Sequence, residues 1–166
     1  MAVASYYQTG SNLGVDLNNI SDTALFTLGT HVIASNGTEF VYVYYATGAT
    51  GGKAMVYSHG FTATGGEATN LLLGFGLGWV QATASSSSYG WLAIRGSVAV
   101  LTSGSCTVSP NGVFLPGASG TTGIVSNNYS ASGTLAGIAF TSIAQTATAT
   151  LTGAILTWPK GGALGQ

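Results

Sequence analysis

The stretch Leu28-Gly-Thr-His-Val-Ile-Ala-Ser-Asn-Gly-Thr-Glu-Phe-Val-Tyr-Val-Tyr-Tyr45 decides the fold class of this chain. Two runs rich in β-branched and aromatic residues flank Asn36-Gly37, and an Asn-Gly pair in this position is the strongest short signal for a β-hairpin. A two-residue type I′ turn needs positive φ at both central residues, which Asn and Gly tolerate best. The stretch therefore predicts two antiparallel strands joined at Asn36-Gly37.

The length of this turn predicts the register of the hairpin, because it sets which residues face each other. A two-residue turn places His31 opposite Tyr42 and Ser35 opposite Thr38. His31 and Glu39 would then lie on opposite faces, which argues against a shared metal site or a catalytic dyad. Both faces of the hairpin would be apolar. A strand with one solvent-exposed face instead alternates polar with apolar residues. We therefore expect the hairpin to be covered on both sides.

The rest of the chain also reads as β, in short apolar runs separated by turn residues. The expected features are strands at 53–58, 71–82, 113–115, 123–125, 133–143 and 148–158, a second hairpin over 89–102 that turns near 95–97, and a loop or single helical turn at 62–70. No window keeps helical spacing over three turns. The predicted fold is all-β, a β-sandwich or barrel-like domain of about ten short strands with very little helix.

The length fits one domain, which we place at residues 28–160. Residues 1–27 are polar and rich in Asn, with Tyr6 and Tyr7 near the start. They are expected to form either an extended arm that orders against a neighbouring molecule or an edge segment of the domain. Residues 161–166 are expected to be a loose tail.

Charge is the most unusual property of the composition. The chain has three basic and four acidic residues, so 4% of it is charged, against roughly 25% in a typical soluble domain. A folded monomer of this mass exposes on the order of 7,500 Å², which leaves about one charge per 1,000 Å². Soluble proteins stay apart through interspersed surface charge. We therefore expect copies of the chain or a partner to cover much of its surface, as in an assembly component.

Composition also argues against several partners. Binding a phosphate backbone takes clustered Lys and Arg, so no nucleic acid is expected. The longest apolar run, 71–80, is half the length of a membrane-spanning helix, and the N-terminus lacks the basic flank and apolar core of a secretory signal. Neither a membrane nor a secretory route is expected. The single cysteine, Cys106, permits no internal disulfide and is expected to be a buried apolar residue.

Residues that carry chemistry are few and scattered. Catalysis needs titratable groups close together, and nothing in the sequence pairs His31 or His59 with an acid. Asp16 and Asp22 are best explained as turn residues. We expect no catalytic residue, no metal and no cofactor, and therefore no enzyme. The tryptophans at 79, 91 and 158 could form a sugar-binding platform, but packing in a core or interface is the favoured interpretation.

Several motifs, in this order and spacing, resemble segments of small head proteins of tailed bacteriophages. The clearest is Tyr89-Gly-Trp-Leu-Ala-Ile-Arg-Gly96. The others are Gly29-Thr30, Glu39-Phe-Val-Tyr-Val43, Gly137-Ile-Ala139 and Leu156-Thr-Trp-Pro-Lys160. Those proteins are capsid decoration, or cement, proteins. The resemblance runs from about Leu28 to Lys160, and the first 27 residues match none of it.

The resemblance implies a structural virion protein made in the host cytoplasm and attached to the capsid surface. Such a protein binds the major capsid protein, stabilises contacts between its subunits, and self-associates as a dimer or trimer. The candidate interface residues are Tyr6 and Tyr7 of the possible N-terminal arm and Tyr89, Trp91 and Arg95 of the Tyr89–Gly96 motif. Two alternatives remain open: another virion component such as a tail, fibre or minor shell subunit, and a carbohydrate-binding β-sandwich.

Overall fold

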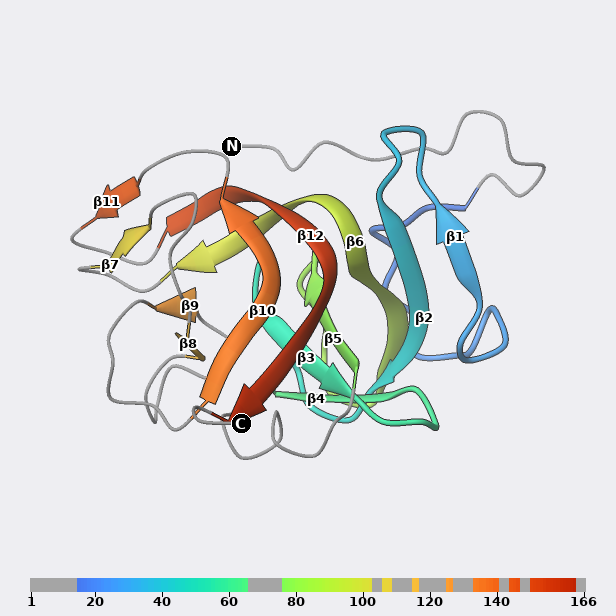
Figure 1. Ribbon diagram of the computed structural model, residues 1–166. Coiled ribbons are helices and arrows are strands. Elements are labelled where there is room, and N and C mark those ends of the chain that lie inside the picture. Colours follow the sequence, from blue (N-terminus) through green and yellow to red (C-terminus); the bar gives the residue numbers. More distant parts are fainter. Residues whose placement is uncertain are drawn as a thin grey trace.

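The computed structural model describes residues 15–65, 76–102, 106–108, 115–116, 125–126, 133–140, 144–146 and 150–163 (Figure 1). Within these ranges the chain is all-β and contains no helix, as the sequence predicts. The strands are β1 (His31–Ile33), β2 (Glu39–Tyr45), β3 (Ala54–Tyr57), β4 (Thr62–Gly65), β5 (Gly76–Val80), β6 (Ser88–Thr102), β7 (Cys106–Val108), β8 (Leu115–Pro116), β9 (Val125–Ser126), β10 (Gly133–Phe140), β11 (Ala144–Thr146) and β12 (Thr150–Ala163).

Five of these strands close into a barrel. β2 pairs with β6, β6 with β5, β5 with β3 and β3 with β4, all antiparallel. A parallel pairing of β4 with β2, in which Thr62 and Ala63 lie opposite Tyr44 and Tyr45, completes the ring. A small barrel is filled by its own side chains. One buried cluster draws on every barrel strand and fills this interior: Val41, Val43, Tyr45, Met55, Ala63, Val80, Leu92 and Ile94, with Ala49 and Ala84 from the loops.

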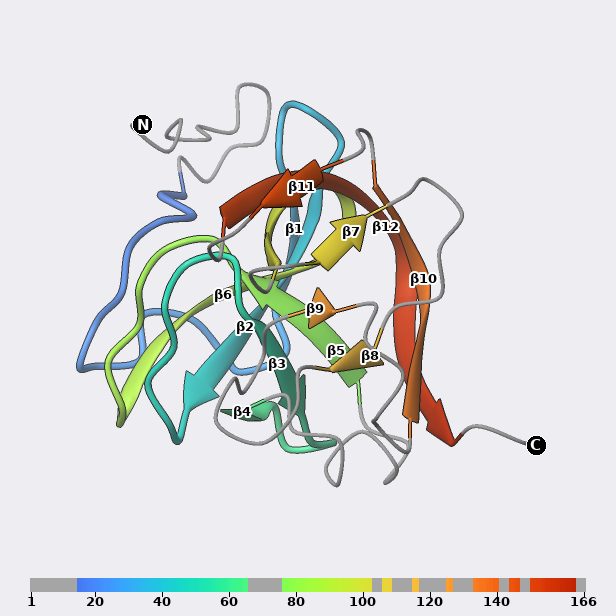
Figure 2. The ribbon, with the colours of Figure 1, turned by 90° about the vertical axis from the view of Figure 1, so that its left-hand side faces the viewer.

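A second layer covers the outside of the barrel. β6 continues beyond the barrel and pairs with β12, which pairs in turn with β10. Both views show β10 and β12 arching over β3 and β5 (Figures 1 and 2). The inward residues of β12, Ala154 and Leu156, belong to the same buried cluster as Val56, Leu77 and Trp79 of the barrel wall. The apolar outer face of β3 and β5 therefore becomes a second core.

A bulge lets β6 leave the barrel without ending. Phe40 lies opposite Ala93 but Glu39 lies opposite Arg95, so Ile94 has no partner on β2. Gly96 follows with φ of 99°, and a Cβ added there would lie 2.6 Å from the Cα of Thr38. The sequence predicts a hairpin turn near 95–97, and this prediction is wrong. The glycine bends one continuous strand, since positive φ serves a bulge as well as a turn.

The loop between β1 and β2 also differs from the predicted type I′ turn. Gly37 has φ of 80°, but Asn36 is not among the residues with positive φ. The amide N–H of Ala34 donates to the carbonyl of Thr38 and that of Gly37 to the carbonyl of Ala34. This is a three-residue loop, a type I turn followed by a left-handed glycine. The Asn36 side chain accepts from the N–H of Thr38 at 3.0 Å, which favours this alternative.

One extra loop residue shifts the register by one and exchanges the faces of β1. His31 lies opposite Val41 and Ile33 opposite Glu39. The prediction that His31 and Glu39 lie on opposite faces is therefore wrong. β2 is covered on both sides, as expected, but β1 is not, because His31 and Ile33 are exposed.

Several predicted boundaries also move. Residues 62–65 form β4 rather than a loop or helical turn, and β5 begins at Gly76, with 71–75 outside the described residues. β12 extends to Ala163, so residues 161–163 of the predicted tail belong to a strand. Of the predicted strands at 113–115 and 123–125, only residues 115 and 125 are described.

The described part of the N-terminal segment packs against the β domain. Val15 and Leu17 are buried in the second core, with Phe26 and Leu28 packed against it. Backbone hydrogen bonds in both directions join Ser21 to Tyr89. Residues 15–27 are therefore an edge segment, and residues 1–14 lie outside the described residues.

Candidate functional site

The candidate site is the outward face of β12 together with the part of β6 beside it. Directly opposite residues on antiparallel strands point to the same face. Four such pairs make up what we name the β12 face: Leu151 with Leu101, Gly153 with Ala99, Ile155 with Ser97, and Thr157 with Arg95. All four β12 members are exposed, and they alternate with the buried Ala154 and Leu156. The alternation follows from the two-residue period of a strand that packs on one side only.

This face is more apolar than a solvated sheet face. An antiparallel sheet with one wet face normally places polar residues outward. Here Leu151 is 53% exposed and Ile155 is 45% exposed, with Leu101 beside Leu151. A single exposed leucine is ordinary, but a contiguous apolar patch is typical of an interaction site. The β12 face is therefore the described surface best suited to contact another protein.

Two charged residues, Glu39 and Arg95, lie at one end of the β12 face. Each strand from β1 through β2 and β6 to β12 contributes one residue to a row that runs across the sheet: Ile33, Glu39, Arg95 and Thr157. The Nδ1 atom of His31 lies 2.9 Å from Oε1 of Glu39. Arg95 is exposed, and its guanidinium group has neither a hydrogen bond nor an ion pair with the described residues. The guanidinium group therefore borders the apolar face unpaired.

The candidate interface residues from the sequence do not gather in one place. Trp91 is 2% exposed and packs against Tyr42 and Phe26. A side chain this deep in the core cannot contact a partner, so we remove Trp91 from the candidate set. Tyr89 is half-buried beside Tyr44, on the face of β6 opposite to that of Leu92. Arg95 borders the β12 face, and Tyr6 and Tyr7 lie outside the described residues.

The described tryptophans do not form a sugar-binding platform. Trp79 and Trp91 are both buried in the second core. The indole N–H of Trp79 has no hydrogen-bond partner in the described structure, which is unfavourable for a buried donor. The favoured interpretation of these two residues, packing, agrees with their positions, and the side chain of Trp158 lies outside the described residues.

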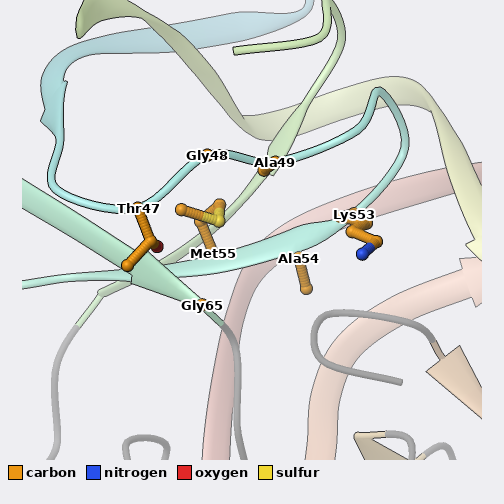
Figure 3. Close-up of a pocket in the computed structure, with 7 residues that line it drawn as sticks. All are labelled: Thr47, Gly48, Ala49, Lys53, Ala54, Met55 and Gly65. Carbon is orange, nitrogen blue, oxygen red and sulfur yellow. The ribbon is translucent and has the colours of Figure 1, made fainter. Parts of the chain in front are cut away.

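One pocket opens between the β2–β3 connection, the start of β3 and the end of β4 (Figure 3). It has a volume of about 280 Å³ and is lined by Thr47, Gly48, Ala49, Lys53, Ala54, Met55 and Gly65. Lys53 is the one titratable side chain among them. Among these described lining residues, no two titratable groups are therefore in contact.

The described residues also bring together no set of three potential metal ligands. His31 and Glu39 make contact, contrary to the prediction, but two groups do not complete a site for zinc, which takes at least three protein ligands. Burial raises the pKa of Tyr45 far above its ordinary value, and its hydroxyl donates to the carbonyl of Trp91 at 2.9 Å. This tyrosine is a neutral structural residue inside the barrel.

Sequence reasoning missed the β12 face because nothing in the string Thr150-Leu-Thr-Gly-Ala-Ile-Leu-Thr157 distinguishes its two sides. Both sides contain small and aliphatic residues, so the pattern predicts a strand but not which side packs. The available signal was the lack of charge over the whole segment.

No family model, curated protein or solved structure matches this chain. No helix in the described ranges is long and apolar enough to cross a membrane.

Proposed function

We propose that this chain is a structural virion protein that attaches to the outside of an icosahedral head, where it stabilises contacts between major capsid subunits. The observation that carries the proposal is the exposed apolar β12 face on a chain with only three basic and four acidic residues. Burial of apolar area contributes about 25 cal/mol per Å² to association. A surface of this kind gains stability when a partner covers it.

The specific choice of a decoration role rests on the resemblance of residues 28–160 to phage head proteins. The fold is compatible with that role, because a closed barrel gives a rigid body and the second layer presents a long sheet face. Self-association as a dimer or trimer belongs to the same proposal, since closed assemblies reuse one surface through symmetry.

The test uses expanded heads of the parent virus that lack this protein. The purified chain is added, bound protein is quantified by sedimentation with the heads, and the heads are melted in a calorimeter. We expect saturable binding and a higher melting temperature of the shell. If the wild-type chain neither binds nor shifts the melting temperature, the decoration role is wrong.

Two variants locate the contact. Leu151→Ser removes an apolar side chain from the β12 face, whereas Leu25→Ser removes an equally exposed leucine from the N-terminal segment. We expect Leu151→Ser to weaken head binding at least tenfold, about 1.4 kcal/mol, and Leu25→Ser to bind as the wild type does. Equal affinity for both variants would show that another surface makes the contact.

A further inference from the structure

We propose that Arg95 recognises a carboxylate on the surface that covers the β12 face, and that this surface belongs to a different protein rather than to a second copy of this chain. The inference rests on the proposed docking role and adds the chemistry of the partner. It predicts that the contact surface of the partner contains an acidic residue surrounded by apolar and uncharged residues.

The position of Arg95 is the first argument. It lies on β6 directly opposite Thr157 of β12, at the end of the face that includes Ile155 and Leu151. It is the one charged residue among the eight that form the face. A partner that covers the apolar part also shields this end from water.

The state of the guanidinium is the second argument. Glu39 is the residue opposite Arg95 on β2, but its carboxylate contacts the imidazole of His31, and only 15% of its side chain is exposed. No described side chain makes an ion pair with the guanidinium of Arg95. A guanidinium that loses water without gaining acceptors is strongly unfavourable, so the partner has to supply them. A carboxylate fits best, because it accepts two parallel N–H bonds from the planar group.

Charge complementarity also decides against a second copy as the occupant. In a twofold symmetric contact each copy presents the same patch to the other. The β12 face contains Arg95 and no acidic residue, and the neighbouring Glu39 is mostly buried and in contact with His31. A face-to-face dimer would therefore bury two positive charges without an available carboxylate. A different protein with an acidic residue on its surface avoids this cost. The ion pair would also fix how the two surfaces align, which is the usual contribution of interface charges.

Binding to heads that lack the protein provides the test, with three variants. Arg95→Gln keeps the length and polarity of the side chain but removes its charge. Arg95→Lys keeps the charge without the paired donors. Lys53→Gln removes a positive charge near the opposite end of the β12 face, where the adjacent Gly52 contacts Leu101 and Leu151, and serves as the matched control for charge close to the face.

We expect Arg95→Gln to weaken binding at least tenfold, mainly through faster dissociation, and Arg95→Lys to fall between it and the wild type. Lys53→Gln should bind as the wild type does. If the wild type binds and Arg95→Gln binds equally well, the inference is overturned while the docking role stands. If the wild type does not bind, the docking role itself fails.

A zero-length carbodiimide crosslink identifies the partner atom. In the Arg95→Lys variant the new amine should couple to a carboxylate within contact distance, and mass spectrometry maps the linked peptides. A link from position 95 to a shell subunit supports the inference. A link from position 95 to a second copy of this chain, or no link there in a complex that has formed, contradicts it.

Discussion

The side-chain amide of Gln81 pairs with both backbone polar groups of Ala99, much as a neighbouring strand would. The N–H of Ala99 donates to Oε1 of Gln81 at 3.2 Å, and Nε2 of Gln81 donates to the carbonyl of Ala99 at 3.3 Å. Gln81 follows the last residue of β5, whereas Ala99 lies in the part of β6 that pairs with β12. This contact therefore ties the barrel to the outer layer and helps to fix the position of the β12 face.

Replacing Gln81 by Ala should lower the free energy of unfolding by about 2 kcal/mol, because it leaves two backbone groups of Ala99 unsatisfied in a part-buried site. Urea denaturation followed by tryptophan fluorescence measures the loss. Thr83→Ala is the control, since this exposed residue makes one long hydrogen bond to the N–H of Gly51 and its loss should change little. Equal stability of the two variants would show that Gln81 does not hold the layers together.

Gly96→Ala should be more destabilising than Gly37→Ala, although both glycines have positive φ. A Cβ at Gly37 would meet nothing within 4 Å, so that variant bears backbone strain alone, about 1 kcal/mol. A Cβ at Gly96 would also press on Thr38, whose hydroxyl donates to the carbonyl of Ser97. We expect a loss of about 3 kcal/mol at Gly96, measured by thermal and urea unfolding. Similar losses at the two sites would mean that the hairpin tip does not pack tightly on the β6 bulge.

Truncation of two neighbouring residues of β12 should lower stability by very different amounts. Leu156→Ala opens a cavity in the second core and should cost about 3 kcal/mol, because Leu156 is almost completely buried. Ile155→Ala removes an exposed side chain and should cost less than about 0.5 kcal/mol. Calorimetric melting of both variants checks the alternation, and a large loss for Ile155→Ala would place that residue in a core instead.

Alkaline pH should unfold the protein partly through Tyr45. Burial raises the pKa of this tyrosine in the folded state, while the unfolded chain keeps a value near 10. Below pH 10 the Tyr45 hydroxyl is protonated in both the folded and the unfolded state, so this group does not change the stability there. Above pH 10 the unfolded state releases the proton first, and stability falls by about 1.4 kcal/mol per pH unit from this group. Tyr57, whose pKa is raised by burial and by the nearby charge of Glu39, contributes in the same direction.

Tyr45→Phe should remove one proton from this linkage. We expect lower stability at pH 8, by about 1 kcal/mol for the lost hydrogen bond to Trp91, but a shallower decline between pH 10 and pH 11.5. Urea denaturation across that range gives both slopes. Parallel slopes for the variant and the wild type would contradict a buried, protonated Tyr45.

His31→Ala should change the free energy of unfolding by less than about 0.5 kcal/mol at pH 7, despite the 2.9 Å contact with Glu39. Exposed ion pairs gain little in water, and 44% of the His31 side chain is exposed. Chemical denaturation compares the variant with the wild type. A loss above 1.5 kcal/mol would show that the pair fixes the register of β1 on β2, a role that we assign to the loop.

The register of β1 shows where local sequence reasoning stops. The Asn36-Gly37 pair predicts a hairpin correctly, but loops of two and three residues use the same pair. In the folded chain the three-residue loop brings Thr38 into contact with Gly96, far away in the sequence. In the same way Gly96 adopts a positive φ, which glycine tolerates best. Such a backbone conformation occurs both in turns and in bulges. The choice between them is made by β12, which pairs with β6 on both sides of that position and keeps the strand continuous.

The sequence by itself determined the all-β character of this chain, the strand that became β2 with both sides buried, and a surface poor in charge. These properties follow from residue type and two-residue periodicity, which act locally. Only the tertiary structure decided which strands close the barrel, that Trp91 lies in a core, and that Leu151 and Ile155 remain exposed. Each of these depends on contacts between segments far apart in the chain, and a strand that is apolar on both sides contains no local signal for the side that its neighbours cover.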